Sequence, residues 1–241
     1  MARKQSYPGL IPIISKKMMV FIPVFAILFS FGVLYTSLNR APDAWPHQGW
    51  KVVNLSYSFD PNEKQATFEG KKVTIPNNVF LSLSKQPSFA VLGEATGEEK
   101  WIDVDISDQK ITAFEGSRVF LESKISSGLP GTPTPTGEFK VWYKTKSQKM
   151  SGGEGRSYYY LPNVPYIMFF ENENVPGYKG YSLHGTYWHD DFGNRRSHGC
   201  VNLPTPVAEQ LYYWTSPVLE NGKRIVRANA DNPGTRIVIH E

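Results

Sequence analysis

The sequence predicts a mainly-β domain with one or two short helices, preceded by an N-terminal transmembrane helix. Glycine and proline number 20 and 18 of the 241 residues, which favours many turns and long loops over a helix bundle. Hydrophobic residues make up 40% and aromatic residues 14%, which is enough to bury a core and excludes wholesale disorder. The third observation is a long apolar segment close to the N-terminus.

This apolar segment covers residues 18–38 and contains no charged side chain. As a helix it extends about 30 Å, which matches the hydrocarbon thickness of a bilayer. Lys16 and Lys17 precede it and only Arg40 follows it, so the positive-inside rule places the N-terminus in the cytoplasm. No clear cleavage site follows, which favours an uncleaved anchor over a cleaved signal peptide or a buried core helix.

The anchor divides the chain into four expected parts. Residues 1–17 are a cytoplasmic tail and residues 18–38 are the single membrane-spanning helix. Residues 39–98 are expected to be a stalk or small accessory β module, and residues 99–240 are expected to form the main domain. Both of these parts would lie outside the cell membrane, in an extracellular or periplasmic location.

The charge distribution argues against a nucleic-acid partner. Five of the 26 Lys and Arg residues lie in residues 1–40, which contain no acidic residue, so the rest of the chain balances 22 acidic with 21 basic side chains. A domain without a basic excess offers no general electrostatic attraction for nucleic acid. The single cysteine excludes both an intramolecular disulfide framework and a multi-cysteine metal cluster.

The strands of the main domain begin at Trp101. Residues 101–106 alternate between apolar and polar side chains, as in a half-buried strand, and the residues Glu115–Ser117 have the composition of a hairpin turn. The other predicted strands are residues 110–114, 118–123, 139–143, 158–170, 181–185 and 236–240, with short β-like runs at 72–75 and 79–83 before them. Loops are expected at residues 127–137 and 149–157, which are rich in proline and glycine.

A single convincing helix follows the last motif-rich stretch. Thr205 is a suitable N-cap and Pro206 suits the first turn. Val207, Leu211 and Trp214 recur at helical spacing and predict one buried stripe.

The chemically informative residues are crowded just before this helix. Three of the five histidines and the only cysteine fall between His184 and Cys200. A thiol attacks as thiolate, and imidazole is the usual side chain that deprotonates it near neutral pH. His198 lies two residues from Cys200, whereas His184 can reach it from an adjacent strand, so both remain candidate bases. Gly199 lets the backbone approach a substrate closely, and its amide and that of Cys200 are candidate oxyanion donors.

Two other interpretations of this cluster are open. Histidine and cysteine together can ligate zinc, but the spacings match no common zinc pattern and a second thiol is missing. The cysteine can also be a small buried hydrophobic residue beside structural histidines. The cluster favours a thiol–imidazole nucleophile site without a metal.

The segment Ser197-His198-Gly199-Cys200-Val201-Asn202 resembles the signature of YkuD-type L,D-transpeptidases. The upstream His184-Gly185-Thr186 element resembles the histidine motif of the same family. The resemblance covers about residues 99–240, and further similar segments are Trp101–Ser107, Gln109–Gly116, Thr134–Phe139 and Gly234–Val238. It implies a β-sandwich catalytic domain of the YkuD type with one or two short helices.

The resemblance also implies an activity, that of a cysteine-dependent acyltransferase in bacterial cell-wall biogenesis. Cys200 would attack a tetrapeptide stem of peptidoglycan, release D-alanine, and pass the acyl group to an amine of another stem in a 3→3 cross-link. By the same resemblance His184 is the proton donor and acceptor. Ser197, His198 and Gly199 shape the nucleophile loop and oxyanion site, and Asn202 holds that loop by hydrogen bonds.

Thioester chemistry requires no cofactor and no metal, so none is expected. The expected partners are the donor and acceptor stem peptides and, through the single N-terminal helix, the membrane. Two alternatives remain beside the transpeptidase. Water as acceptor would make the protein an L,D-carboxypeptidase, and a protein without catalysis would be a wall-binding module.

Overall fold

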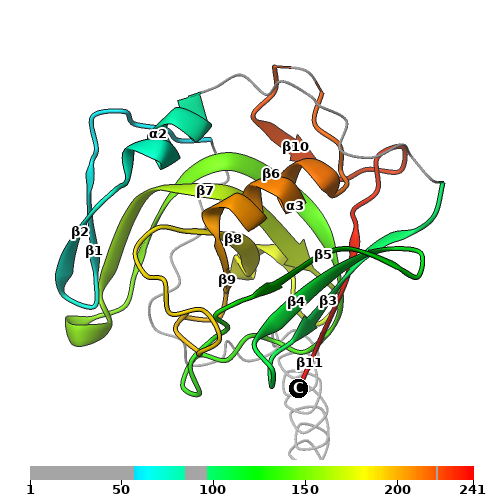
Figure 1. Cartoon of the computed structure of the whole chain (residues 1–241), viewed down its shortest axis with the longest axis horizontal. Helices are drawn as coiled ribbons and strands as arrows, with labels where there is room; N and C mark the ends of the chain where they lie inside the picture. The colour runs from blue at the N-terminus through cyan, green and yellow to red at the C-terminus, as the bar shows by residue number, and fades with distance from the viewer. Residues whose placement is uncertain (1–56, 85–96, 221) are drawn as a thin grey trace, which may run out of the picture. The chain divides into compact units, whose positions relative to one another are not determined.

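The computed structural model describes residues 57–84, 97–220 and 222–241 (Figure 1). The predicted tail at 1–17 and anchor at 18–38 lie outside these residues. Within the part of the chain that is described, no helix has the length and apolar character needed to span a bilayer.

The described residues are mainly β. The strands are β1 (Gln65–Phe68), β2 (Lys71–Thr74), β3 (Lys100–Asp105), β4 (Lys110–Glu115), β5 (Arg118–Lys124), β6 (Gly137–Gly152), β7 (Tyr159–Glu171), β8 (Ser182–Thr186), β9 (Val201–Pro204), β10 (Ile225–Arg227) and β11 (Arg236–His240). The α-helices are α2 (Asn77–Ser84) and α3 (Thr205–Trp214), and the 3₁₀ turns are η1 (Gly155–Ser157) and η2 (Gly177–Lys179). The prediction of a mainly-β domain with one or two short helices is therefore confirmed for these residues.

The strands form one continuous hydrogen-bonded sheet in the order β2-β1-β7-β6-β11-β3-β4-β5. Strand β10 also pairs with β6, and β8 connects β7 to β9. The strands are thus not divided between two separately bonded sheets, as a strict sandwich would require. The reason is the length of β6 and β7, at 16 and 13 residues, and the register shifts between them, which bend a strand as bulges do.

Strand β7 separates two hydrophobic cores. Tyr166 and Met168 face the larger core, whereas Ile167 and Phe169 face a smaller one. Successive side chains of a strand point to opposite faces, so a strand covered on both sides has a nearly continuous apolar sequence. The smaller core lies beneath the candidate site described below.

Helix α3 packs on β7 and β8 (Figure 1). It contains the predicted apolar stripe, of which Leu211 and Trp214 are buried and Val207 is partly buried. Thr205 is not an N-cap: it is the first helical residue, and its hydroxyl donates to the Thr186 carbonyl at 3.2 Å, which fastens the helix to the end of β8. The buried Lys144 donates to carbonyls at the other end of the helix, at 2.5 Å and 2.7 Å, and so satisfies carbonyls that have no partner in the last turn.

Two local predictions were wrong. The run 79–83 is part of helix α2, in which Val79 and Leu83 are buried four residues apart, the spacing of one helix face. The expected loop at 149–157 is partly strand, because β6 continues to Gly152 and is paired with Tyr159 of β7. Long-range pairing with β7 keeps this glycine-rich end extended, which local composition does not indicate.

Residues 57–84 pack into the larger core of the domain. Ile75, Val79 and Leu83 are buried there. The Asn163 side chain fastens the segment from the β7 side: its Oδ1 accepts from the Asp60 amide at 2.9 Å and its Nδ2 donates to the Asp60 carbonyl at 2.8 Å. Strand β1 then joins the end of β7.

Candidate active site

The parallel pairing of β8 and β9 brings the sequence motifs together. His184 is paired with Asn202, and Leu183 with Val201. Cys200 immediately precedes β9, so it lies beside the start of β8. The strand pairing therefore places the histidine and the cysteine, 16 residues apart in sequence, in the lining of one pocket.

Cys200 is partly buried, and its thiol is hydrogen-bonded to the chain. Its Sγ lies 3.5 Å from the Ser182 hydroxyl and 3.8 Å from the Gly180 carbonyl oxygen. Burial raises the pKa of the thiol above its usual value, and the hydrogen bond from Ser182 only partly opposes this. At neutral pH the resting nucleophile is consequently a protonated thiol, which needs a base when it attacks.

His184 has the environment of such a base. Its side chain is 3% exposed, and its Nδ1 donates to the Gly185 carbonyl at 3.1 Å. A carbonyl oxygen only accepts, so the proton is on Nδ1 and the lone pair is on Nε2. Burial lowers the pKa of His184 to about 4, which keeps the ring neutral at physiological pH.

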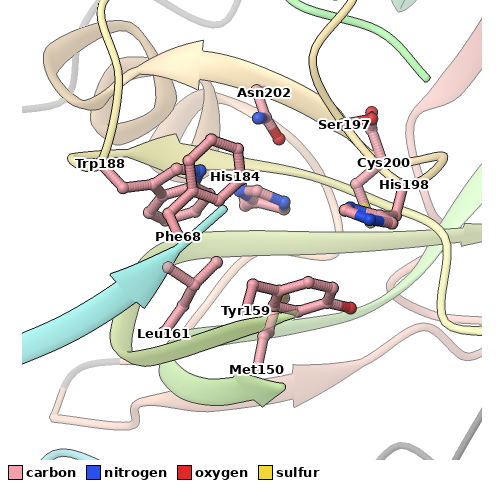
Figure 2. A pocket seen from close by; sticks show the side chains of 10 residues that line it. All are labelled: Phe68, Met150, Tyr159, Leu161, His184, Trp188, Ser197, His198, Cys200 and Asn202. Carbon is pink, nitrogen blue, oxygen red and sulfur yellow. The ribbon is translucent and has the colours of Figure 1, made fainter. Parts of the chain in front are cut away.

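His184 and Cys200 lie along one wall of the pocket. Figure 2 shows His184 between Trp188 on one side and the Cys200–His198 pair on the other. Among the described residues, no direct hydrogen bond joins the His184 ring to Sγ. Such contacts in unliganded sites often tighten only when substrate binds.

His198 also lines the pocket but is held differently. Its ring packs against Tyr159 with centroids 5.0 Å apart. Within the described part of the chain, its ring nitrogens have no hydrogen-bond partner that would fix the tautomer, whereas Gly185 fixes that of His184. A base oriented by a third group is the recurring arrangement of nucleophile sites, and here only His184 has that third group.

The nucleophile loop, residues 195–200, is braced internally. Ser197 donates its hydroxyl hydrogen to the Cys200 carbonyl and accepts from the Gly199 amide at 3.0 Å. Ser197 therefore supports the loop that presents the thiol. The Gly199 amide is already engaged, so this bond would have to break before that amide could serve an oxyanion.

Gly199 itself is required by the shape of the loop. Its φ is +118°, and a Cβ placed there would lie 2.7 Å from a ring carbon of Tyr181. We expect Gly199→Ala to lower the free energy of unfolding by about 1–3 kcal/mol, because both the backbone and the neighbouring ring must shift. Denaturant unfolding measures this loss. Gly131→Ala is the matched control, since its φ is ordinary and no atom lies within 4 Å; an equal loss in both variants would contradict the explanation.

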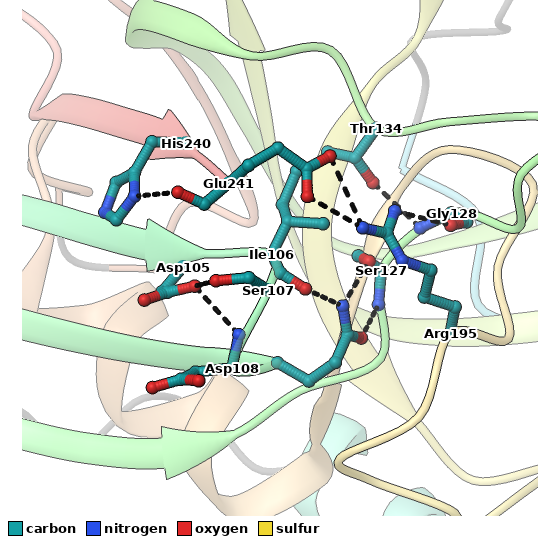
Figure 3. Close-up of polar contacts among 11 residues, drawn as sticks. Asp105, Ile106, Ser107, Asp108, Ser127, Gly128, Thr134, Arg195, His240 and Glu241 are labelled. Atoms are coloured by element: carbon teal, nitrogen blue, oxygen red, sulfur yellow. Dashed lines mark hydrogen bonds and ion pairs between the residues drawn. The ribbon is translucent and has the colours of Figure 1, made fainter.

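A second loop supports the nucleophile loop from behind. The Ser127 carbonyl accepts from the amides of Arg196 and Ser197 at 2.9 Å and 3.0 Å. Ser127 is itself held by the buried Gln109, whose side chain bonds both its amide and its hydroxyl. Figure 3 shows Ser127 in this network beside Arg195, which pairs with Glu241 at 3.0 Å.

Asn202 has a different partner from the one expected. Its Nδ2 lies 2.9 Å from His189 Nε2, and its side chain makes no bond to the nucleophile loop. Burial lowers the pKa of His189 to about 4, so the ring stays neutral and Nε2 accepts this bond. The Asn202 Oδ1 is buried and has no hydrogen-bond partner among the described residues. The predicted loop-holding role thus belongs to Ser197.

The pocket contains residues that sequence reasoning did not select. Its volume is about 40 Å³. Its lining residues are Phe68, Met150, Tyr159, Leu161, His184, Trp188, Ser197, His198, Cys200 and Asn202 (Figure 2). Phe68, Met150 and Leu161 come from strands far from the motif in sequence and were not selected. Ser182, which contacts Sγ, was not selected either.

The histidines do not converge on a metal site. In residues 57–84, 97–220 and 222–241, no group of three or more His, Cys, Asp and Glu side chains is arranged to hold a metal ion. His189 bonds Asn202, and His184 bonds its neighbouring carbonyl.

Comparison with known proteins agrees with the motif. The family model for the YkuD L,D-transpeptidase catalytic domain matches residues 99–239. The Bacillus subtilis (strain 168) protein "Putative L,D-transpeptidase YciB" is 30% identical over 174 residues, which are 67% of this chain and 87% of that protein.

Two solved structures are also similar. An L,D-transpeptidase from Mycobacterium smegmatis has 23% identity and a TM-score of 0.47, with 59% of each chain covered. An Enterococcus faecium L,D-transpeptidase has 28% identity and a TM-score of 0.44, with 59% of this chain and 50% of that chain covered. The chain thus spans less than two thirds of either solved chain. By its match to the family model, the chain belongs to the L,D-transpeptidase catalytic domain family.

Proposed function

We propose that this protein is a peptidoglycan L,D-transpeptidase that uses Cys200 as nucleophile and His184 as general base and acid. The observation that carries the proposal is the arrangement of the two side chains. Both line one pocket, His184 from β8 and Cys200 from the position just before the parallel strand β9, and the Gly185 carbonyl fixes the tautomer of His184. The family, shown by its domain match, supplies the class of reaction.

The proposed acylation step begins with the resting thiol. His184 Nε2 takes the thiol proton as Sγ attacks the carbonyl carbon of the third residue of a donor tetrapeptide stem. The bond to the terminal D-alanine then breaks, and His184 returns the proton to the departing nitrogen. The products are a thioester on Cys200 and free D-alanine.

The thioester is then transferred. The side-chain amine of the third residue of another stem attacks its carbonyl carbon and gives a proton to His184. The C–S bond breaks, and Sγ regains the proton from His184. The net result is one 3→3 cross-link for each D-alanine released, with no cofactor or metal consumed.

The depressed pKa of His184 predicts an unusual pH dependence. The ring works as a base only when neutral, and its pKa of about 4 keeps it neutral down to well below the usual pKa of histidine. We expect the acylation rate to hold between pH 7 and about 5.5 and to fall as pH drops through about 4. The pH profile of kcat/KM, with folding checked by circular dichroism at each pH, tests this. A fall centred near 6.5 would contradict it.

The proposed activity is tested with the purified full-length chain and disaccharide-tetrapeptide, read by mass spectrometry. We expect a dimer that lacks one D-alanine and that is absent from the Cys200→Ala variant. A Cys200-dependent tripeptide without dimer would instead indicate the L,D-carboxypeptidase. Absence of product and of any acyl-enzyme adduct would overturn the proposal and leave the wall-binding module.

Location is part of the same proposal. Peptidoglycan lies outside the cell membrane, so residues 39–241 must be exported, with residues 18–38 as a single anchor. Protease added to spheroplasts should remove the domain while leaving a cytoplasmic marker intact. Protection of the domain would contradict this orientation.

A further inference from the structure

The pocket is completed by a residue outside the part of the chain that the family model matches. That part is residues 99–239, whereas Phe68 belongs to β1. Phe68 is 7% exposed and lines the pocket together with His184 and Cys200. In Figure 2 its ring lies beside Trp188, at the end of the pocket away from Cys200.

The Phe68 ring is fixed by several groups of the site. Its centroid lies 6.2 Å from that of Trp188 and 5.9 Å from that of His189. The guanidinium carbon of Arg196 lies 5.9 Å from the same ring. In the ladder Phe68 is paired with Tyr159, another lining residue. The ring is therefore built into the wall.

The β1–β2 hairpin, residues 65–74, is also fastened to the nucleophile loop. Glu69, in the hairpin turn, pairs with Arg196 at 3.1 Å. Arg196 precedes Ser197, and the Ser127 carbonyl holds its amide. The ion pair between Glu69 and Arg196 thus joins the hairpin to the nucleophile loop.

The size and chemistry of the pocket determine which substrate groups can enter it. The wall opposite Cys200 is formed by apolar side chains, and Phe68 lies at the end of the pocket away from the thiol. None of the described lining residues is acidic, so no counter-charge is present for an amine. A hydrophobic pocket discriminates by size, and one extra methylene changes selectivity by about tenfold or more.

We propose that the β1–β2 hairpin is a specificity element of the substrate site, in which the Phe68 ring limits the size of the substrate side chain that the pocket admits. The proposal rests on the proposed transpeptidase function for the identity of that side chain, the D-alanine methyl. The size limit itself is a property of access to Cys200 and is tested without peptidoglycan.

The first experiment measures access to the thiol in the full-length chain. Cys200 is the only cysteine, so maleimides report on this site alone. N-methylmaleimide and N-pyrenylmaleimide share one reactive group and differ in bulk, so their rate ratio cancels changes in thiol reactivity. We expect Phe68→Ala to raise the pyrenyl-to-methyl ratio about tenfold, and Phe68→Leu to give an intermediate value.

Phe80→Ala is the matched control, because Phe80 belongs to the same segment and packs on Phe59 rather than lining the pocket. Its ratio should equal that of the wild type. An unchanged ratio in both Phe68 variants would overturn the proposal. An equal rise in Phe80→Ala would also overturn it, since general loosening of the segment would then explain the effect. If Phe68→Ala does not fold, Phe68→Leu decides.

The second experiment compares kcat/KM for stems ending in D-alanine and in D-leucine. Phe68→Ala should lower the ratio of kcat/KM for the D-alanine stem to kcat/KM for the D-leucine stem about tenfold, and Phe80→Ala should leave this ratio unchanged. A wild-type enzyme that processes neither stem would contradict the proposed function, and the maleimide ratio would still decide the role of Phe68. Turnover with an unaltered preference would overturn the specificity role alone.

Discussion

Cys200→Ala should abolish acyl-enzyme formation and leave the fold intact. The nucleophile supplies the bond that defines the intermediate, and its removal in a nucleophile–base pair lowers turnover by about 10⁶-fold. The side chain is small, and among the described residues its Sγ has two hydrogen-bond contacts, with Ser182 and Gly180. The change in the free energy of unfolding should therefore stay below about 1 kcal/mol.

Intact-mass spectrometry after mixing with donor stem measures the adduct, and thermal unfolding measures the fold. Ser182→Ala is the informative control: it removes the hydroxyl beside Sγ and keeps the thiol. That variant should still form the thioester. Persistent transfer in Cys200→Ala would refute the mechanism, and a large loss of stability would leave unfolding as the cause.

His184→Ala should cost far more rate than His198→Ala. Proton transfer by a positioned side chain contributes about 10²–10⁴-fold, and His184 alone of the two has its tautomer fixed by a backbone carbonyl. His198 packs on Tyr159 and shapes the wall, so its loss should cost roughly tenfold or less, expressed mainly in KM.

The rate of thioester formation in a single turnover compares the two variants without any contribution from product release. His184→Gln is the matched variant, since its amide fills the site but transfers no proton near neutral pH. It should be nearly as slow as His184→Ala. Faster acylation by His184→Ala than by His198→Ala would show that His198 is the base.

Local sequence pattern was sufficient to predict the secondary-structure elements nearest the candidate active site. The helix after the cysteine motif and the strand that carries His184 lie within one residue of where they were expected to begin, because apolar periodicity determines them, whereas β9 was not predicted. Local pattern did not predict the helix at Val79–Leu83 or the extension of β6 to Gly152. Packing of Val79 into the core decides the first, and pairing with Tyr159 decides the second.

The same distinction applies to the site. Cys200 and the two candidate bases His184 and His198 were selected because reactive residue types cluster within one stretch. Ser197, and the choice of His184 as the base, came from the resemblance to the family signature. Phe68 and Ser182 were not selected, since neither carries a reactive group or stands at a motif position. They belong to the site because of where they lie in the fold, and this depends on the pairing of β1 with β7 and of β8 with β9. The partner of Asn202, His189, was missed for the same reason.

The burial of Cys200 also affects its chemical durability. Oxidants attack the thiolate far faster than the thiol, and sulfinic and sulfonic products are not repaired by ordinary thiol exchange. Because burial raises the pKa of Cys200, the idle protein exposes almost no thiolate at neutral pH. The only cysteine of the chain is thus kept in its least oxidisable form until a substrate is bound. In the exported location proposed above, this protection would preserve the nucleophile in an oxidising space between turnovers.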